Sequence, residues 1–492
     1  MKWIVQLSKQ VKPTMSEAAV TTNEEAPRWS RLFDNIDREH GFESLRVEGH
    51  LPQDLIGTIY RNGPGVFTRG GVRIAHLFDG DGAIAATRFS HAEAEGAVRF
   101  VQTRAREREE RKQRWLYGGY KQSFQRPIRE VLLGRSKNPA NTGVLLHQGK
   151  LFALCEAGKP IELHPDELST LGEEDFGGVI QTFNAHPKRV VSRAATYSIG
   201  VRLGRTHQID ILEVPDFGCA RRLATLPAGT VGMVHDFAVT ERHLILFIPP
   251  QRVKLLSMLL RNRGLVDAID WDQSAGTEIV TISLDAPDQV RRFRTESFYM
   301  EHVANAYEEK DGEIVIDFTR YENLATFENL VQPLVHLRVG APLSMSLSRM
   351  RLAASCKSAT FETLLGESCE LPHTANAHRG KRHNVTYLAG QPDSERPYDA
   401  FTSTLKIDHL HNRVERFFHG KDTAGGEPIF VPRPNAKDED DGYLLVPVFD
   451  PKTGSSHEAI FDARRVSDGP IARAHHSQPI PPRFHGAWLE PV

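Results

Sequence analysis

Short apolar stretches separated by polar turns recur along most of the chain. Residues 144–154, 237–247 and 306–318 each predict two short strands around a polar turn, and residues 442–449 predict a further strand. Strand pairs that recur without alternating helices predict an all-β protein. Because the pattern continues over about 450 residues, it favours blades around an axis over a single sandwich, which seldom exceeds about 250 residues.

Two stretches depart from this hairpin pattern. Residues 104–137 are strongly charged and carry three aromatic residues, so we expect an irregular or partly helical insertion. Residues 251–265 follow a strand that ends in two prolines, and we expect a loop or short helix outside the blades. Residues 1–28 are mostly polar and are expected to form a disordered lead-in. This leaves residues 29–492 as a single β domain.

The composition narrows the possible functions. The 61 Lys and Arg residues nearly balance the 63 Asp and Glu residues, for a net charge of −2, which does not favour bulk binding to nucleic acid. The four cysteines have no paired spacing, so a reduced, intracellular protein is the simplest interpretation. No stretch approaches the roughly 20 apolar residues of a spanning helix, and the N-terminal apolar run is too short for a signal peptide.

Four of the 22 histidines lie beside strand-like runs and next to small or turn-forming residues. They are His186, His235, His302 and His485. Small neighbours allow several backbones to approach one centre, so we expect the four to meet as ligands of one metal ion. Neutral imidazoles suit iron, zinc or copper, and spacings of 49, 67 and 183 residues exclude a local zinc finger. The alternative for each histidine alone is a hydrogen-bonded place in the core.

Histidine ligands need acceptors behind them that fix the ring tautomer and raise the basicity of the ring. Three glutamates in apolar or turn settings are candidates for this role: Glu156, Glu370 and Glu427. Glu156 ends an apolar strand, where burying a carboxylate without a partner is costly. The alternative is an exposed glutamate at the end of that strand.

Six ordered motifs extend over nearly the whole chain, from about Arg46 to Trp488. They are 51–65 (LPQDLIGTIYRNGPG), 78–82 (FDGDG), 137–142 (KNPANT), 426–434 (GEPIFVPRP), 439–445 (EDDGYLL) and 485–488 (HGAW). Together they resemble the carotenoid cleavage oxygenase family, with a pattern typical of its bacterial apocarotenoid 15,15′-oxygenase type. The resemblance implies a seven-bladed β-propeller with a helical and loop dome over the face that carries the active site.

The resemblance also implies a ferrous ion on the propeller axis, bound by the four histidines named above. Glu156, Glu370 and Glu427 are implied to hold His235, His302 and His485, in that order, and His186 is implied to lack a carboxylate partner. Four neutral imidazoles leave two positions of an octahedral Fe(II) shell open.

The implied activity is cleavage of a conjugated C=C bond of a carotenoid or apocarotenoid with O2, giving two carbonyl products. The resemblance implies that the methyl group of Thr142 partly blocks one open coordination position of the iron. The alternative is that Thr142 packs in the core. A polyene also needs a long apolar tunnel. The candidates to line it, each of which could equally be plain core, are Phe67, Trp115, Tyr117, Tyr120 and Phe298.

Two departures from the family pattern leave the substrate open. The residue before His302 is Glu301, whereas the corresponding motif in relatives is often Phe-His-His-Ala-Asn. The insertion 104–137 is also unusually charged. One alternative is a stilbene-cleaving oxygenase, in which Lys137 with Tyr117 or Tyr120 would clamp a phenol. A different class is a catalytically silent lipid-binding propeller, whose signature would be a missing ligand.

Residues 252–263 predict a contact with a membrane surface. Six of the eight residues 253–260 are apolar, and basic residues flank them on both sides. Eight residues cannot span a bilayer, but they can enter its interface while the basic side chains reach lipid phosphates. The alternative is a buried helix of the dome. We therefore expect a cytoplasmic, monomeric protein that associates weakly and peripherally with membranes.

Overall fold

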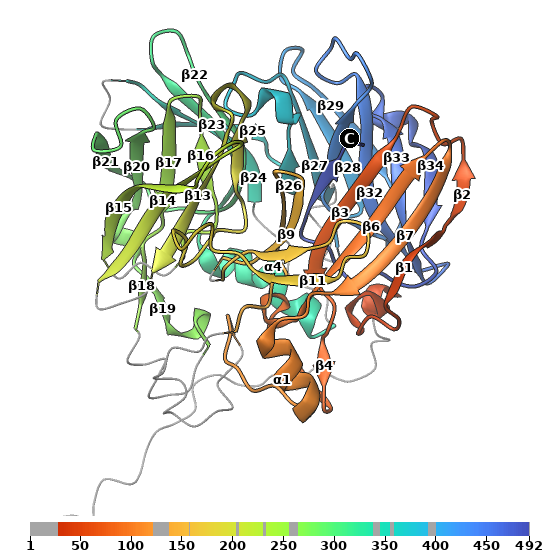
Figure 1. Ribbon diagram of the computed structural model, residues 1–492. Helices are drawn as coiled ribbons and strands as arrows, with labels where there is room; N and C mark the ends of the chain where they lie inside the picture. The colour runs from red at the N-terminus through yellow and green to blue at the C-terminus, as the bar shows by residue number, and fades with distance from the viewer. Residues whose placement is uncertain are drawn as a thin grey trace, which may run out of the picture.

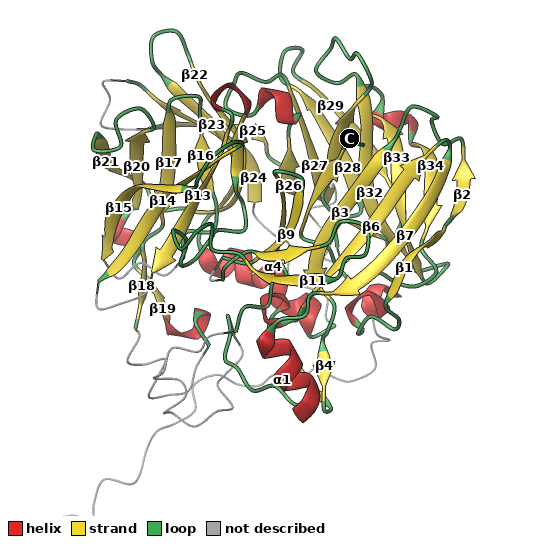
Figure 2. Ribbon diagram, viewed as in Figure 1, coloured by secondary structure: helices red, strands yellow, loops and turns green. Residues whose placement is uncertain are grey.

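The computed structural model describes residues 28–121, 137–156, 158–202, 206–229, 233–254, 264–337, 345–354, 359–391 and 400–491. Within these residues, seven antiparallel sheets of four to six strands stand around one axis (Figures 1 and 2). The expected seven-bladed β-propeller is therefore confirmed. The lead-in expected at residues 1–28 lies outside the described residues, apart from Arg28.

Four blades are formed by consecutive stretches of the chain, with the inner strand first. The first two comprise β8 (Gly143–His147), β9 (Lys150–Leu154), β10 (Ile161–Leu163) and β11 (Thr170–Glu173), and then β12 (Lys188–Val190), β13 (Ala195–Arg202), β14 (His207–Pro215) and β15 (Arg221–Gly229). Another comprises β22 (Tyr299–Glu308), β23 (Ile314–Tyr321), β24 (Met345–Leu352) and β25 (Thr360–Leu365). The blade after it comprises β26 (Ser368–His373), β27 (Val385–Gln391), β28 (Ser403–Asp408) and β29 (Arg413–Phe418).

A fifth blade carries an inserted hairpin, β18 (Gln251–Val253) and β19 (Ile269–Trp271), between its second and third strands. Its own strands are β16 (Phe237–Val239), β17 (His243–Ile248), β20 (Thr277–Ser283) and β21 (Val290–Thr295). The strand pairs predicted at 144–154, 237–247 and 306–318 are all present as hairpins of the blades.

Strands from both ends of the chain complete the last two blades and close the ring. One contains β1 (His40–Ser44), β7 (Glu93–Phe100), β6 (Gly82–Ser90), β3 (Gly57–Pro64) and, innermost, β35 (His485–Leu489). The other contains β2 (Arg46–Gly49), β34 (Pro470–His475), β33 (Ser455–Asp462), β32 (Gly442–Asp450), β30 (Ala424–Gly425) and β31 (Ile429–Pro432). In the first of these blades, Asn62 of β3 pairs with His485 of β35.

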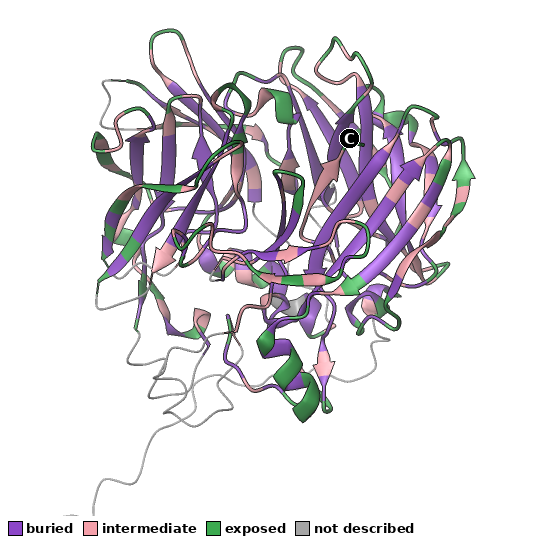
Figure 3. Ribbon diagram, viewed as in Figure 1, coloured by how far each residue is buried: buried purple, intermediate pink, exposed green. Residues whose placement is uncertain are grey.

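Apolar side chains of neighbouring blades pack face to face and form the core. Ile199 and Ile211 of one blade, for example, belong to the same buried cluster as Leu246 and Val280 of the next. Central strands are therefore buried on both faces, as all eight residues of β3 are. In β17 this burial goes with a continuous apolar run, residues 244–248, rather than an alternating one. Figure 3 shows the central strands buried and the loops and outer edges exposed.

A dome covers one face of the ring (Figure 1). It contains helices α1 (Arg104–Lys112) and α4 (Leu324–Val335), the β18–β19 hairpin, and the small hairpin of β4 (Thr68–Arg69) and β5 (Val72–Arg73). The N–H of Leu265 donates to the carbonyl of Gly119 at 3.2 Å, so the two predicted insertions touch. Helix α1, with Thr103 as its N-cap, lies at the start of the first of these segments. Of the helices in the described residues, none is long and apolar enough to cross a membrane.

Candidate metal centre

The four histidines lie on or just before the inner strands of four blades. His186 and His235 come just before β12 and β16, His302 lies within β22, and His485 begins β35. Their Nε2 atoms converge. His186 Nε2 is 3.0 Å from His235 Nε2, which is 3.4 Å from His302 Nε2. The ring of His485 is centred 4.5 Å from that of His186 and 4.7 Å from that of His302.

These distances fit the donor set of a divalent metal. Two nitrogens bound at about 2.1 Å on perpendicular axes of one ion lie about 3.0 Å apart. All four rings are largely buried, and a buried cluster of imidazoles without a common partner would be costly. The structure therefore supports a histidine-rich metal site on the axis, and the four residues that sequence reasoning selected are brought together in it.

Each expected carboxylate lies beside the Nδ1 atom of its histidine, on the side away from the convergence point. Glu370 Oε2 is 2.5 Å from His302 Nδ1, and Glu427 Oε1 is 3.0 Å from His485 Nδ1. Glu156 Oε1 is in ion-pair contact with His235 Nδ1 at 2.6 Å. These contacts place the Nδ1 proton on the carboxylate side and leave Nε2 as the donor atom.

The carboxylates are themselves held by further donors. Glu370 Oε1 accepts from the Thr319 hydroxyl at 2.6 Å and the Tyr321 hydroxyl at 2.9 Å. Glu427 Oε2 accepts from the backbone N–H of Gly486 at 2.8 Å. Burial works against the charge on Glu427, but the adjacent His485 outweighs it and lowers the pKa of Glu427 to about 2. Glu370 and Glu427 are thus held in place by hydrogen bonds from both sides.

Burial favours neutral rings at two of the four histidines. It lowers the pKa of His302, and it lowers the pKa of His186 well below the usual value, with neighbouring imidazoles adding to the effect. His235 differs because Glu301 and Glu156 more than offset its burial and raise its pKa to about 9.

Glu301 is the residue of this centre that sequence reasoning did not assign. Its side chain is 2% exposed, and its Oε1 lies 3.1 Å from His235 Nε2, on the converging side of the ring. Burial raises the pKa of Glu301 to about 8. The only signal in the sequence was the position of Glu301 next to His302, in a motif that differs from the usual sequence of the family.

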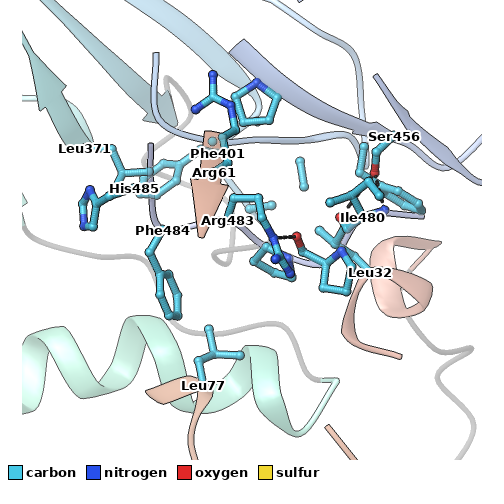
Figure 4. Close-up of a pocket in the computed structure, with 18 of the residues that line it drawn as sticks. Leu32, Arg61, Leu77, Leu371, Phe401, Ser456, Ile480, Arg483, Phe484 and His485 are labelled. Carbon is cyan, nitrogen blue, oxygen red and sulfur yellow. Dashed lines mark hydrogen bonds between the residues drawn. The ribbon is translucent and has the colours of Figure 1, made fainter. Parts of the chain in front are cut away.

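An apolar cavity of about 180 Å³ opens from the histidines toward the dome and is bordered by α4. Thr142 lines it, with its hydroxyl donating to Asn141 Oδ1 at 3.1 Å. Figure 4 shows Leu77, Phe401 and Phe484 around this cavity, with His485 at one side. The aromatic side chains that line it are Trp29, Phe33, Phe78, Phe327, Phe401, Phe449 and Phe484.

The five aromatic residues expected along a tunnel are not among the described residues that line this cavity. Trp115 packs under the guanidinium of Arg69, and Phe67 packs edge-on against Phe33, which does line it. Phe298 packs against Phe318 inside a blade. Tyr120 likewise contacts a residue that lines the cavity, Phe78. The cavity is instead lined by α4, by residues near both ends of the described chain and by residues around the histidines, which no local pattern connects.

The phenol clamp of the stilbene alternative is not formed. The ammonium group of Lys137 is buried between Asp81 at 2.7 Å and Glu109 at 3.1 Å. The Tyr120 hydroxyl donates to Glu328 at 2.8 Å, and the Tyr117 hydroxyl accepts from Arg108 at 3.2 Å. Lys137 therefore stabilises the base of the dome.

Comparison with known proteins agrees with this geometry. Residues 33–490 match the family model described as RPE65, retinal pigment epithelial membrane protein. The apocarotenoid-15,15′-oxygenase of Synechocystis sp. is 28% identical, over 94% of this chain and 96% of that protein. The resveratrol cleavage oxygenase 1 of Aspergillus fumigatus is 26% identical, over 94% and 95%.

The solved structures give the same result. The crystal structure of cobalt-substituted Synechocystis ACO superposes with a TM-score of 0.87 at 25% identity, covering 94% of this chain and 98% of that one. A family model that spans nearly the whole chain, together with this fold, establishes the relationship. The chain belongs to the RPE65 family, the family of the carotenoid cleavage oxygenases.

Proposed function

We propose that this protein is a non-haem Fe(II) oxygenase that cleaves a conjugated C=C bond of a carotenoid or apocarotenoid with O2, giving two carbonyl products. The observation that carries the proposal is the convergence of four buried imidazoles, backed by three carboxylates, at the end of an apolar cavity. The relative named as an apocarotenoid-15,15′-oxygenase supports the substrate class.

In this proposal His186, His235, His302 and His485 hold the iron, which supplies the activation of O2 when bound. The carboxylates of Glu156, Glu370 and Glu427 fix the rings. The aromatic cavity aligns the polyene and keeps water from the reacting bond. Because the hydroxyl of Thr142 is engaged by Asn141, we assign to its methyl group the narrowing of the space beside the iron.

The test is incubation of the iron-loaded protein with apocarotenoids of graded length and, separately, with resveratrol. We expect two carbonyl products from the apocarotenoids, identified by mass, and none without O2 or iron. Cleavage of resveratrol alone would replace the proposal with the stilbene-cleaving alternative. Absence of bound iron and of any cleavage would indicate a catalytically silent propeller.

Glu370→Gln is expected to keep the fold and to lower iron affinity or turnover by about 10–100-fold, because an amide holds the His302 ring less firmly than a carboxylate. The measurement is iron content and initial rate, with the circular dichroism spectrum as a check of folding. The matched control is Glu362→Gln, an exposed position on the adjacent blade. Equal activity of the two folded variants would make Glu370 a structural residue only.

We also propose weak peripheral contact with membranes through residues 252–263. Val253 of this segment is buried, and its other apolar residues lie outside the described part of the chain, so the proposal rests on their sequence and on the position of β18 and β19 in the dome. The two described basic residues, Arg252 and Lys254, pair with Asp272 and Asp270. We therefore assign most of the contact to the apolar residues.

Replacing Leu255, Leu256, Leu259 and Leu260 with serine is expected to lower liposome binding and the turnover of membrane-held substrate. Turnover of detergent-solubilised substrate should remain, because the metal centre is unchanged. Co-sedimentation with liposomes measures the first effect. Undiminished sedimentation of a folded variant would show that the contact lies elsewhere.

A further inference from the structure

Glu301 lies inside the ring of candidate histidine ligands rather than behind it. Its Oε1 is 3.1 Å from His235 Nε2, whereas Glu156 contacts the Nδ1 atom of the same ring. Donor atoms of Glu301, His235 and His302 all lie within 4.8 Å of one another. Glu156 also comes within 3.9 Å of an Nε2 atom, that of His186, but the 3.1 Å approach of Glu301 is closer, and Glu301 is therefore the glutamate positioned most directly toward the ion.

An irregularity in β22 explains how two consecutive residues reach the same centre. Neighbouring residues of a regular strand point to opposite faces. The pairing of β22 with β23 shifts register between Met300 and Val303, the interval that contains Glu301 and His302. A bulge of this kind redirects a side chain and is common beside active sites, so both side chains turn toward the axis.

The carboxyl group of Glu301 is also oriented as a ligand would be. The Tyr299 hydroxyl donates to its Oε2 at 2.5 Å, which leaves Oε1 on the side of His235. Metal-binding carboxylates are usually held in this way, with a hydrogen bond to the oxygen that does not coordinate. Both residues are almost fully buried, and Glu301 lines the same apolar cavity as His235 and His302.

The separations also match those already seen among the nitrogens. The 3.1 Å between Glu301 Oε1 and His235 Nε2 falls between the 3.0 and 3.4 Å that separate neighbouring Nε2 atoms of the histidines. One ion at about 2.0–2.2 Å from its nitrogen and oxygen donors fits such a set.

We propose that Glu301 is a fifth protein ligand of the metal, supplied by Oε1 and oriented by Tyr299. The inference rests on the proposed four-histidine centre. A fifth, anionic ligand reduces the positive charge of the site by one unit, holds the divalent ion more tightly, and leaves one position of an octahedral shell for O2 in place of two.

Cobalt(II) is a suitable probe, because a relative has been crystallised in a cobalt-substituted form and because the visible spectrum of Co(II) reports its coordination. The dissociation constant for Co(II), measured by competition with a chelator, and the visible spectrum are compared among the wild type and three variants. Glu301→Gln replaces the carboxylate ligand with an amide, and Glu301→Leu removes the ligand. Tyr299→Phe removes only the hydroxyl that orients the carboxylate.

We expect Glu301→Gln to bind Co(II) at least about tenfold more weakly than the wild type, Glu301→Leu to bind still more weakly, and Tyr299→Phe to show the smallest loss. The spectra of both Glu301 variants should change. The matched control is Glu308→Gln on the same strand, where the carboxylate contacts His243 and Arg242 instead. The Glu308→Gln variant should have the same dissociation constant for Co(II) and the same visible spectrum as the wild type.

Unchanged affinity and spectrum in folded Glu301→Gln and Glu301→Leu would overturn the assignment of Glu301 while leaving the four histidines in place. Tighter binding in Glu301→Leu would overturn it as well. A wild-type protein that binds neither Co(II) nor Fe(II) would overturn the metal centre itself. The thermal midpoint of each metal-free variant separates loss of a ligand from loss of the fold.

Discussion

Changing His302 to alanine is expected to remove most of the bound iron and all detectable cleavage. The imidazole is one of four that converge on the axis, and it is held by Glu370 at 2.5 Å. With three histidines left, the ion is held more weakly, and Glu370 is left buried without the ring that stabilises its charge. Iron content of the purified protein and product formation from an apocarotenoid are the two measurements.

His243→Ala is the matched control for this variant. His243 also contacts a carboxylate, with its Nδ1 2.9 Å from Glu308 Oε1, but it lies at the start of β17 and outside the converging set. It should retain full iron content and turnover. Full iron occupancy and activity in a folded His302→Ala protein would refute the assignment of His302 as a ligand.

Arg61→Met is expected to lower the free energy of unfolding by about 3–5 kcal/mol, the usual cost of removing one partner of a buried ion pair. Arg61 is 3% exposed and donates to both oxygens of Glu458, at 2.6 and 3.2 Å. It also donates to the carbonyls of Glu427 and Leu445. One guanidinium thus joins the two blades that close the ring, and methionine would leave all these acceptors unpaired.

Arg189→Met provides the comparison. Arg189 makes the same two-pronged contact with Asp216, at 2.6 and 3.3 Å, but its side chain is 46% exposed. Exposed pairs contribute about 0–1 kcal/mol, so its loss should be hardly measurable in a urea titration. Equal effects of the two substitutions would show that burial of the Arg61 pair does not matter for stability.

Local sequence pattern predicted the blades well because the hairpins are local. The turn at residues 147–150 and the apolar residues on each side appear in the structure as β8 and β9. The meeting of His186 and His485, which are 299 residues apart, could not be derived from spacing. This meeting was predicted from the resemblance of the ordered motifs to the family. The hydrophobic pattern alone does not indicate which strands close the ring.

What the sequence did not reveal depends on departures from regular geometry. The approach of Glu301 to the axis needs the register shift in β22, and no sequence rule placed that shift. The cavity is lined by Trp29, Phe327 and Phe484, which are distant in the chain and meet only after the dome packs on the ring. Lys137 is recognisable as part of a motif, but only its contacts with Asp81 and Glu109 show that it is structural.

The pairing of β35 with β3 has a consequence for biosynthesis. During translation the N-terminal part of a chain emerges first and begins to fold as it is made. His485 lies on β35, and its partner on β3, Asn62, precedes it by 423 residues. The strands of the other six blades are therefore synthesised before the fourth histidine can reach the axis. Binding of the metal by all four histidines therefore requires that β35 has closed the ring on β3.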